Sequence, residues 1–470
     1  MFGDTPLVLV DTPSLLADAV ARLRLAPVIG IDTESDGFHR YREKVCLIQI
    51  SDMDQDYIFD CLALDDLNPL GALFGDPNQI KIFHGADYDV VSMRRDFGFD
   101  FVNLFDTMIA AQFLGLPRVG LADLIDRWFA VRVDKTLQRH DWSARPLLPA
   151  HLDYARGDTH WLLALREVLL TRLKRAGRLG AVAEECTLVA QRSWQGRQRD
   201  PADFLRLKGS RGLDDAALRV LRAVHGYRDR EAEAMDRPAF KVIPDHMLLE
   251  LAERRPETRE ETLGVLRRGS PLARRHGEGL HAAVVEGVAD TRPIPEPKAE
   301  ARVHLPVRVS GRVSDLLLNG LKEWRSERIE RDREPPVTVI SNHIIKALSR
   351  LAPRSLEELA AVPDMRSWQV ERHGVQLLAL IEQVAGSGPT EASTGKKRRR
   401  RRRGPREDDV GGPVEGEPGA GEPEESESGG DELADSELAD SELADSELAD
   451  TEMDDASPAA SEPAGDDTGA

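Results

Sequence analysis

The sequence has few cysteines, few aromatic residues and no long apolar stretch. Its 470 residues include three cysteines, and aromatic residues make up 5% of the chain. Three cysteines cannot build a disulfide framework or a four-cysteine zinc site, which favours a reducing compartment. No apolar run reaches 18 residues, and residues 1–14 lack the basic start and apolar core of a signal peptide. The sequence therefore predicts a cytoplasmic protein with no membrane span.

The formal net charge of −20 is distributed unevenly along the chain. Residues 404–470 contain 24 acidic residues and one basic residue, whereas residues 396–403 are eight consecutive cations. The remaining residues carry a net charge of only −5. An acidic total argues against a nucleic-acid partner, but here the excess acid lies in one terminal segment. The body of the chain is compatible with such a partner.

The C-terminal segment, residues 388–470, is of low complexity. The pentapeptide SELAD repeats with a period of five, which matches neither a helix nor a strand. Because large apolar groups are scarce, we predict a disordered tail. Two interpretations of the basic run at 396–403 stay open, since it could bind RNA phosphates or be neutralised by the acidic segment. The SELAD repeats in the acidic segment at 404–470 could reduce non-specific RNA binding, bind a basic protein partner or only solvate the chain.

The first 195 residues predict a mixed α/β domain. Short runs of apolar and β-branched residues at 27–32, 45–51, 57–60 and 80–85 are typical of strands. Helical patterns follow, among them one long amphipathic helix over 151–175. Three strands come first, and helices then alternate with a further strand. This order indicates a sheet covered by helices.

Two later regions are related to each other by sequence. Residues 200–287 and 306–387 are both helical in pattern, and a shift of 97 positions superimposes them without gaps. The shift places Tyr227 on Trp324 and His246 on His343. Two copies are too few for a solenoid, so we predict two small all-helical domains. The proline-rich residues 288–305 form the linker between them.

Several acidic residues stand where the predicted elements end or begin. Asp32 and Glu34 lie two apart at the end of the first predicted strand, so their side chains share a face. Asp89 lies one turn into the helix after the strand at 80–85, and Tyr154 and Asp158 stand at i and i+4 on a later helix. Each motif alone is weak evidence. Asp106, before Thr107, fits a helix N-cap at least as well as a ligand.

In combination, these motifs resemble a known family. The order IDTES, HGADYDVVSMRRDFG, LFDT, DWSARPL and YARGDTHWLL is similar to ribonuclease D and its nuclear-exosome relatives, in the tyrosine subtype of the DEDD exonuclease superfamily. The sister subtype has histidine five residues before the last aspartate, where this chain has Asp153. The two helical repeats resemble HRDC domains, of which ribonuclease D carries two.

The resemblance implies the fold and the site. The expected fold is an α/β RNase H-like exonuclease domain, two all-α HRDC-like domains and a disordered acidic tail. The implied catalytic residues are Asp32, Glu34, Asp89, Tyr154 and Asp158, with the four carboxylates holding two Mg²⁺ or Mn²⁺ ions. By this analogy Asp32 bridges both ions, Glu34 and Asp158 hold the ion that carries the attacking water, and Asp89 serves the other. Tyr154 orients the water, since a tyrosine of ordinary pKa is not a free base.

Other residues have two interpretations each. His84 contacts substrate or packs at a strand end, and Trp142 stacks a base or lies in the core. Arg145 meets a phosphate or pairs with a nearby acid, and Gln49 braces the site or pairs across the sheet. In the helical repeats, a nucleic-acid-binding face would have to come from clustering that the sequence does not show, such as Arg228, Arg230 and Lys241 on one side, and helix-bundle spacers that shape a substrate channel are the alternative.

The leading hypothesis is a metal-dependent 3′–5′ exoribonuclease that releases 5′-mononucleotides from RNA with a free 3′ end. The resemblance implies tRNA precursors as substrate. One alternative is a DNA 3′–5′ exonuclease, because HRDC-like domains also occur in DNA helicases. The other is a non-catalytic RNA-binding scaffold, although such a protein has no reason to keep four uncompensated acids together.

Overall fold

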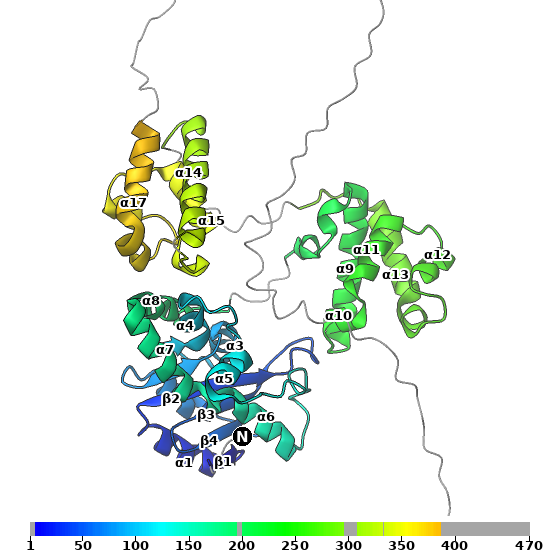
Figure 1. Ribbon diagram of the computed structural model, residues 1–470. Helices are drawn as coiled ribbons and strands as arrows, with labels where there is room; N and C mark the ends of the chain where they lie inside the picture. The colour runs from blue at the N-terminus through cyan, green and yellow to red at the C-terminus, as the bar shows by residue number, and fades with distance from the viewer. Residues whose placement is uncertain (1–4, 195–199, 296–307, 332, 387–470) are drawn as a thin grey trace, which may run out of the picture. The chain divides into compact units, whose positions relative to one another are not determined.

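The computed structural model describes residues 5–194, 200–295, 308–331 and 333–386 (Figure 1). The predicted disordered tail with its basic run therefore lies outside the described residues, as does part of the predicted linker at 288–305.

The N-terminal region contains a six-stranded mixed sheet in the order β1-β4-β3-β2-β5-β6. Its strands are β1 (Leu7–Val10), β2 (Val28–Ser35), β3 (Val45–Ser51), β4 (Asp56–Asp60), β5 (Ile80–Phe83) and β6 (Leu104–Asp106). Strands β2, β3 and β4 are antiparallel neighbours, whereas β5 is parallel to both β2 and β6. All seven residues of β3 are buried, which explains why this central strand reads as a continuous apolar run.

Eight helices accompany the sheet in the described part of this region. They are α1 (Pro13–Leu23), α2 (Asn68–Phe74), α3 (Asp87–Phe97), α4 (Thr107–Phe113), α5 (Leu121–Phe129), α6 (Pro149–His160), α7 (Leu162–Ala176) and α8 (Leu179–Ala190). Helix α6 packs on β2, β3 and β4, and α7 packs on β2 and β5. The mixed α/β fold is as predicted, but the single helix expected over 151–175 is wrong, since the helix breaks at Trp161.

Two helical regions follow the sheet domain. The first comprises the 3-10 turns η1 (Asp203–Arg206) and η2 (Ser210–Gly212) and helices α9 (Asp215–Ala234), α10 (Ala239–Val242), α11 (Asp245–Arg254), α12 (Arg259–Val265) and α13 (Pro271–Ala289). The second comprises α14 (Gly311–Glu330), η3 (Pro336–Thr338), α15 (Asn342–Leu351), α16 (Leu356–Ala360) and α17 (Ser367–Gly386). None of the described helices is both long enough and apolar enough to cross a membrane.

The helical regions repeat each other in structure as well as in sequence. A shift of 97 residues places α11 on the bounds of α15 and the start of α12 on the start of α16. The same shift places the starts of α9 and α13 within one residue of the starts of α14 and α17. An edge-on ring pair also repeats. Tyr227 lies 6.0 Å from His276 between ring centroids, and at the equivalent positions Trp324 lies 5.4 Å from His373. Each region therefore packs its own core in the same way.

Candidate active site

Strand β2 brings the first two candidate carboxylates to the site. Asp32 and Glu34 point to the same side of this strand, which lies in the middle of the sheet between β3 and β5. Both residues are half-buried, whereas Ile29 and Ile31 earlier in the strand are fully buried. The apolar part of the strand anchors it in the core, and its polar end stays within reach of solvent.

Helix α3 supplies the third carboxylate. Asp89 lies in the first turn of α3 and is only 6% exposed, and the Thr33 hydroxyl on β2 donates to its Oδ1 at 2.5 Å. Asp87, two residues earlier, is exposed and pairs with Arg192. The structure thus places Asp89, and not Asp87, beside the strand that carries the other acids.

Asp106 fixes the turn that leads into α3. Its carboxylate accepts hydrogen bonds from the backbone N–H groups of Gly85 at 3.1 Å and Ala86 at 2.8 Å, and it also caps α4 through Met108. Gly85 has φ +76°, and a Cβ there would lie 2.8 Å from the Met108 methyl. Of the two interpretations of Asp106, the N-cap is the one that the structure shows.

Helix α6 carries Tyr154 and Asp158 on one face, packed against β2, β3 and β4. Both residues are half-buried. The Tyr154 ring lies 5.7 Å from the ring of Trp142, which is 1% exposed. The structure therefore places Trp142 in the core, where it supports Tyr154 and is out of reach of a base.

Burial and the charges of neighbouring acids raise the pKa values of all four candidate carboxyl groups, and for Asp89 the neighbouring acid is Asp106. Burial is the largest cause at each of them. The charge of Asp89 also raises the pKa values of Asp32, Glu34 and Asp158, and the pKa values of Asp89 and Asp158 rise to about 7. Burial and then the charge of Asp158 raise the pKa of Tyr154 as well. The hydroxyl of Tyr154 thus keeps its proton at neutral pH.

The donor set fits hard divalent cations. Carboxylate oxygens are the ligands that Mg²⁺ and Mn²⁺ prefer, and buried carboxylates whose pKa values are raised are stabilised in their ionised form by positive charge. Within the described ranges, no three His, Cys, Asp or Glu side chains are grouped closely enough to hold an ion as they stand.

Gln49 is a further polar residue at this site. It lies opposite Asp32 in the antiparallel pairing of β2 and β3, so the two side chains share a face of the sheet. Its side chain is fully buried, and neither Nε2 nor Oε1 has a hydrogen-bond partner among the described residues. An unsatisfied buried amide beside a cluster of acids indicates a residue whose partner belongs to the working site.

We expect Gln49→Leu to stabilise the metal-free protein and to impair the enzyme. Removing two unpartnered polar atoms should raise the free energy of unfolding by about 1 kcal/mol. Loss of the amide beside Asp32 should weaken activation by Mg²⁺ about tenfold. Denaturant unfolding and a Mg²⁺ titration of activity measure the two effects. Gln191→Leu, at an exposed glutamine, is the control; equal Mg²⁺ activation in both variants would contradict the prediction.

Two of the weaker candidates have protein partners. Arg145 donates to both carboxylate oxygens of Asp60, at 2.7 and 2.6 Å, which is the ion-pair alternative. His84 Nδ1 lies 2.9 Å from Thr107 Oγ1, which itself donates to a backbone carbonyl, so Nδ1 carries the hydrogen. Burial lowers the pKa of His84 to about 4, and its Nε2 has no partner among the described residues. Substrate contact by His84 stays a prediction.

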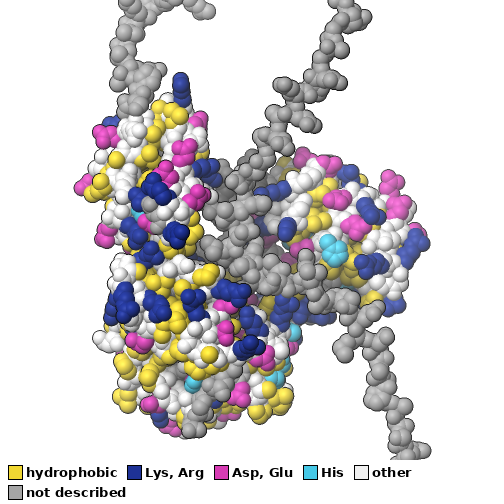
Figure 2. Space-filling model, viewed as in Figure 1, with side chains coloured by type: hydrophobic (Ala, Val, Ile, Leu, Met, Phe, Trp, Pro, Cys, Tyr) yellow, Lys and Arg dark blue, Asp and Glu magenta, His cyan; other side chains and the backbone are white. Residues whose placement is uncertain are grey.

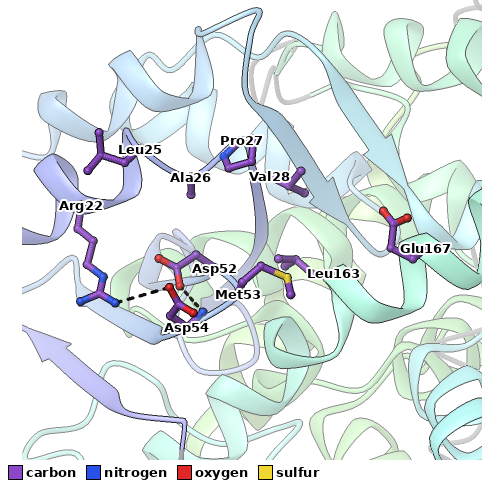
Figure 3. A pocket seen from close by; sticks show the side chains of 10 residues that line it. All are labelled: Arg22, Leu25, Ala26, Pro27, Val28, Asp52, Met53, Asp54, Leu163 and Glu167. Atoms are coloured by element: carbon purple, nitrogen blue, oxygen red, sulfur yellow. Dashed lines mark hydrogen bonds and ion pairs between the residues drawn. The ribbon is translucent and has the colours of Figure 1, made fainter.

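A hollow of about 380 Å³ lies elsewhere on the sheet domain (Figure 3). Pro27 and Val28 at the start of β2, Met53 after β3 and Leu163 on α7 line it, and Arg22 approaches Asp54 at 4.0 Å across its rim. Asp32 and Glu34 lie toward the other end of β2. The hollow is therefore separate from the carboxylate cluster.

Family comparisons agree with the two-part architecture. The family model described as 3′–5′ exonuclease matches residues 7–174, and the HRDC domain model matches residues 217–284 and 315–381. The exosome complex component 10 homolog of Drosophila melanogaster is 36% identical over 64% of this chain, which spans about a third (34%) of that relative. A ribonuclease D of Gluconacetobacter diazotrophicus is 32% identical over 79% of this chain and 92% of its own length. The chain belongs to the ribonuclease D family.

Solved structures of ribonuclease D relatives share this fold. The structure of Escherichia coli RNase D, an exoribonuclease involved in structured RNA processing, is 26% identical to this chain, covers 80% of it and 99% of its own length, and has a TM-score of 0.58. The catalytic core of RRP6 from Trypanosoma brucei is 33% identical over 62% of this chain and 81% of its own, with a TM-score of 0.55. Exonucleases of this family depend on divalent metal ions.

Proposed function

We propose that this ribonuclease D family member is a metal-dependent 3′–5′ exoribonuclease that releases 5′-mononucleotides. The observation that carries the proposal is the cluster of Asp32, Glu34, Asp89 and Asp158 beside Tyr154, inside a domain that matches the exonuclease family. Relatives named ribonuclease D and a solved exoribonuclease support RNA as the substrate.

The four carboxylates would hold two ions, Mg²⁺ or Mn²⁺. Bound there, the ions supply activation of water at neutral pH and relief of charge on the leaving oxygen. Thr33 holds Asp89 in place through its hydroxyl, and the α6 backbone holds Asp158 one turn from Tyr154. Tyr154 Oη keeps its proton, so it can donate a hydrogen bond and orient the attacking water without acting as a base.

Precursor tRNA is the proposed natural substrate. The cytoplasmic localisation of the protein stays a prediction from the sequence. The Escherichia coli relative is an exoribonuclease involved in structured RNA processing, which supports a substrate with a folded body and a single-stranded 3′ end. The competing DNA exonuclease hypothesis uses the same carboxylates, so only the substrate distinguishes the two.

A direct test compares matched substrates. Wild-type protein with Mg²⁺ should shorten a 5′-labelled RNA one nucleotide at a time from its 3′ end and release 5′-mononucleotides. A tRNA precursor should be trimmed to its folded body, and DNA of the same sequence should be degraded more slowly. EDTA should stop the reaction because the carboxylates then lack their cations. Faster digestion of DNA would favour the repair-type alternative, and binding of RNA without hydrolysis would favour the scaffold.

A further inference from the structure

Trp128 at the end of α5 carries two guanidinium groups. The Cζ atom of Arg127 lies 5.8 Å from the centroid of the Trp128 ring, and that of Arg172 on α7 lies 5.3 Å from it. Cation–π contacts of this kind orient a guanidinium while leaving its N–H donors free for another partner. The indole therefore holds one arginine from each of two helices in place.

These arginines are not neutralised by acids. Arg127, Arg172 and Arg175 are exposed, and within the described residues none of them forms an ion pair with a carboxylate. By contrast, Arg118 before α5 pairs with Asp123 at 3.3 Å. Arg172 and Arg175 stand three apart on α7 and so lie on neighbouring positions of one helix face. Figure 2 shows Lys and Arg side chains gathered on the side of this domain where α4, α5 and α7 lie.

A stacked aromatic pair connects the helix of the arginines with the helix of the last carboxylate. Phe129, next to Trp128, stacks on Trp161 with ring centroids 5.1 Å apart and planes 27° apart. Trp161 follows Asp158 by three residues, at the junction of α6 and α7. From there Arg172 lies about 15 Å along the helix, because each residue adds 1.5 Å. An RNA strand several nucleotides long is needed to reach from the acids to the arginines.

A purely structural role explains only part of this arrangement. Cations in the last turn of a helix are stabilised by its dipole, which accounts for Arg175 on α7 and for Arg127 on α5. It does not account for Arg172, which lies before the last turn of α7 with its guanidinium over the Trp128 indole. A group of guanidinium groups without carboxylate partners, on the same domain as the candidate nuclease site, matches the charge of a phosphate backbone.

We propose that Arg127, Arg172 and Arg175, arranged around Trp128, bind phosphates of the RNA strand upstream of the 3′ end. This surface would hold the body of the substrate while its terminal nucleotide lies at the carboxylates. The inference rests on the proposed exoribonuclease function, and it assigns a binding surface to a face of the exonuclease domain itself.

The test removes the three charges together as Arg127→Gln/Arg172→Gln/Arg175→Gln. For a 20-nucleotide single-stranded RNA, KM should rise about tenfold, whereas for a dinucleotide it should change less than twofold because that substrate cannot span the distance. The slope of log affinity against log salt should fall by about 2, since each lost phosphate contact on a single strand contributes about 0.7. Fluorescence anisotropy of labelled RNA, with all proteins in the Asp32→Asn background, measures the slope without hydrolysis.

The single variant Arg172→Gln is compared with a matched control, Arg24→Gln. Arg24 is also an exposed arginine of the sheet domain, and no ion pair of it is found among the described residues. Circular dichroism melting shows whether each variant is folded. Equal affinity and equal salt slope in wild type and a folded triple variant would overturn the arginine surface while leaving the nuclease assignment intact. Loss of RNA binding in the triple variant, together with no hydrolysis by wild type, would support the surface and refute the exonuclease proposal.

Discussion

Replacing Asp32 with asparagine is expected to lower the rate of Mg²⁺-dependent RNA shortening by about a thousandfold or more. The charges of the other three acids all raise the pKa of Asp32, so its own charge acts on the whole cluster. Asparagine keeps the size of the side chain and removes that charge. Metal-assisted phosphodiester hydrolysis depends on the ions that this charge would hold. A single-turnover assay with 3′-labelled RNA measures the loss.

The same substitution should make the metal-free protein more stable. In wild type, four carboxylates repel one another, and three of them raise the pKa of Asp32. Asparagine removes one of those charges, and we expect the free energy of unfolding at pH 8 in EDTA to rise by about 2 kcal/mol. If Asp32 acts in the reaction, the variant should combine lower activity with higher stability. If Asp32 is only structural, the variant should lose both activity and stability, so denaturant unfolding distinguishes the two roles.

A matched pair of variants controls this prediction. Asp89→Asn should lose activity like Asp32→Asn, whereas Asp87→Asn should stay within about twofold of wild type because Asp87 is exposed and pairs with Arg192. Full activity in Asp32→Asn, with a preparation free of contaminating nuclease, would refute the assignment of the site. Loss of activity in Asp87→Asn alone would show that the second motif had been placed on the wrong aspartate.

The sequence predicted which acids meet but not what positions them. The order of motifs and the i, i+4 spacing of Tyr154 and Asp158 were visible in the residues. The role of Asp106 was not decidable, because its contacts to Gly85 and Ala86 depend on a parallel pairing of β5 with β6 that no local pattern reveals. Burial of Trp142 was equally undecidable, since an aromatic residue beside a charged motif fits both a core and a stacking platform.

Fold prediction failed where elements are short or where partners are distant. Strands β1 and β6 have four and three residues and owe their existence to pairing with β4 and β5, so the sequence pattern missed both. Arg228 is an example of a cation that could have belonged to a nucleic-acid-binding face, but it is 5% exposed and donates to the Ile243 carbonyl and to Asp245. The sequence could not show this, because a charged residue on a helix is expected to be exposed unless its buried partner is known.

The second large effect concerns pH and metal together. The pKa values of Asp89 and Asp158 in the folded protein are about 7, mainly through burial, and thus lie above those of an unfolded chain. Between about pH 4 and pH 7 the folded state therefore binds more protons than the unfolded state. The stability contributed by these groups is fully present below about pH 4 and is lost as the pH rises through 7. As the pH rises through 7, the free energy of unfolding of the metal-free protein should accordingly fall by about 2 kcal/mol because of these two groups.

Divalent ions should reverse that loss only where the carboxyl groups are ionised. Because metal and protons compete for the same oxygens, saturating Mg²⁺ should raise the melting temperature clearly at pH 8 and hardly at pH 5. Other acids, such as Asp56, have lowered pKa values and lose stability at low pH, so the measured quantity is the difference between wild type and Asp158→Asn at each pH. That difference should grow from pH 5 to pH 8 in EDTA and change sign when Mg²⁺ is added. A difference that is independent of both pH and Mg²⁺ would mean that Asp158 neither senses the other acids nor binds the ion.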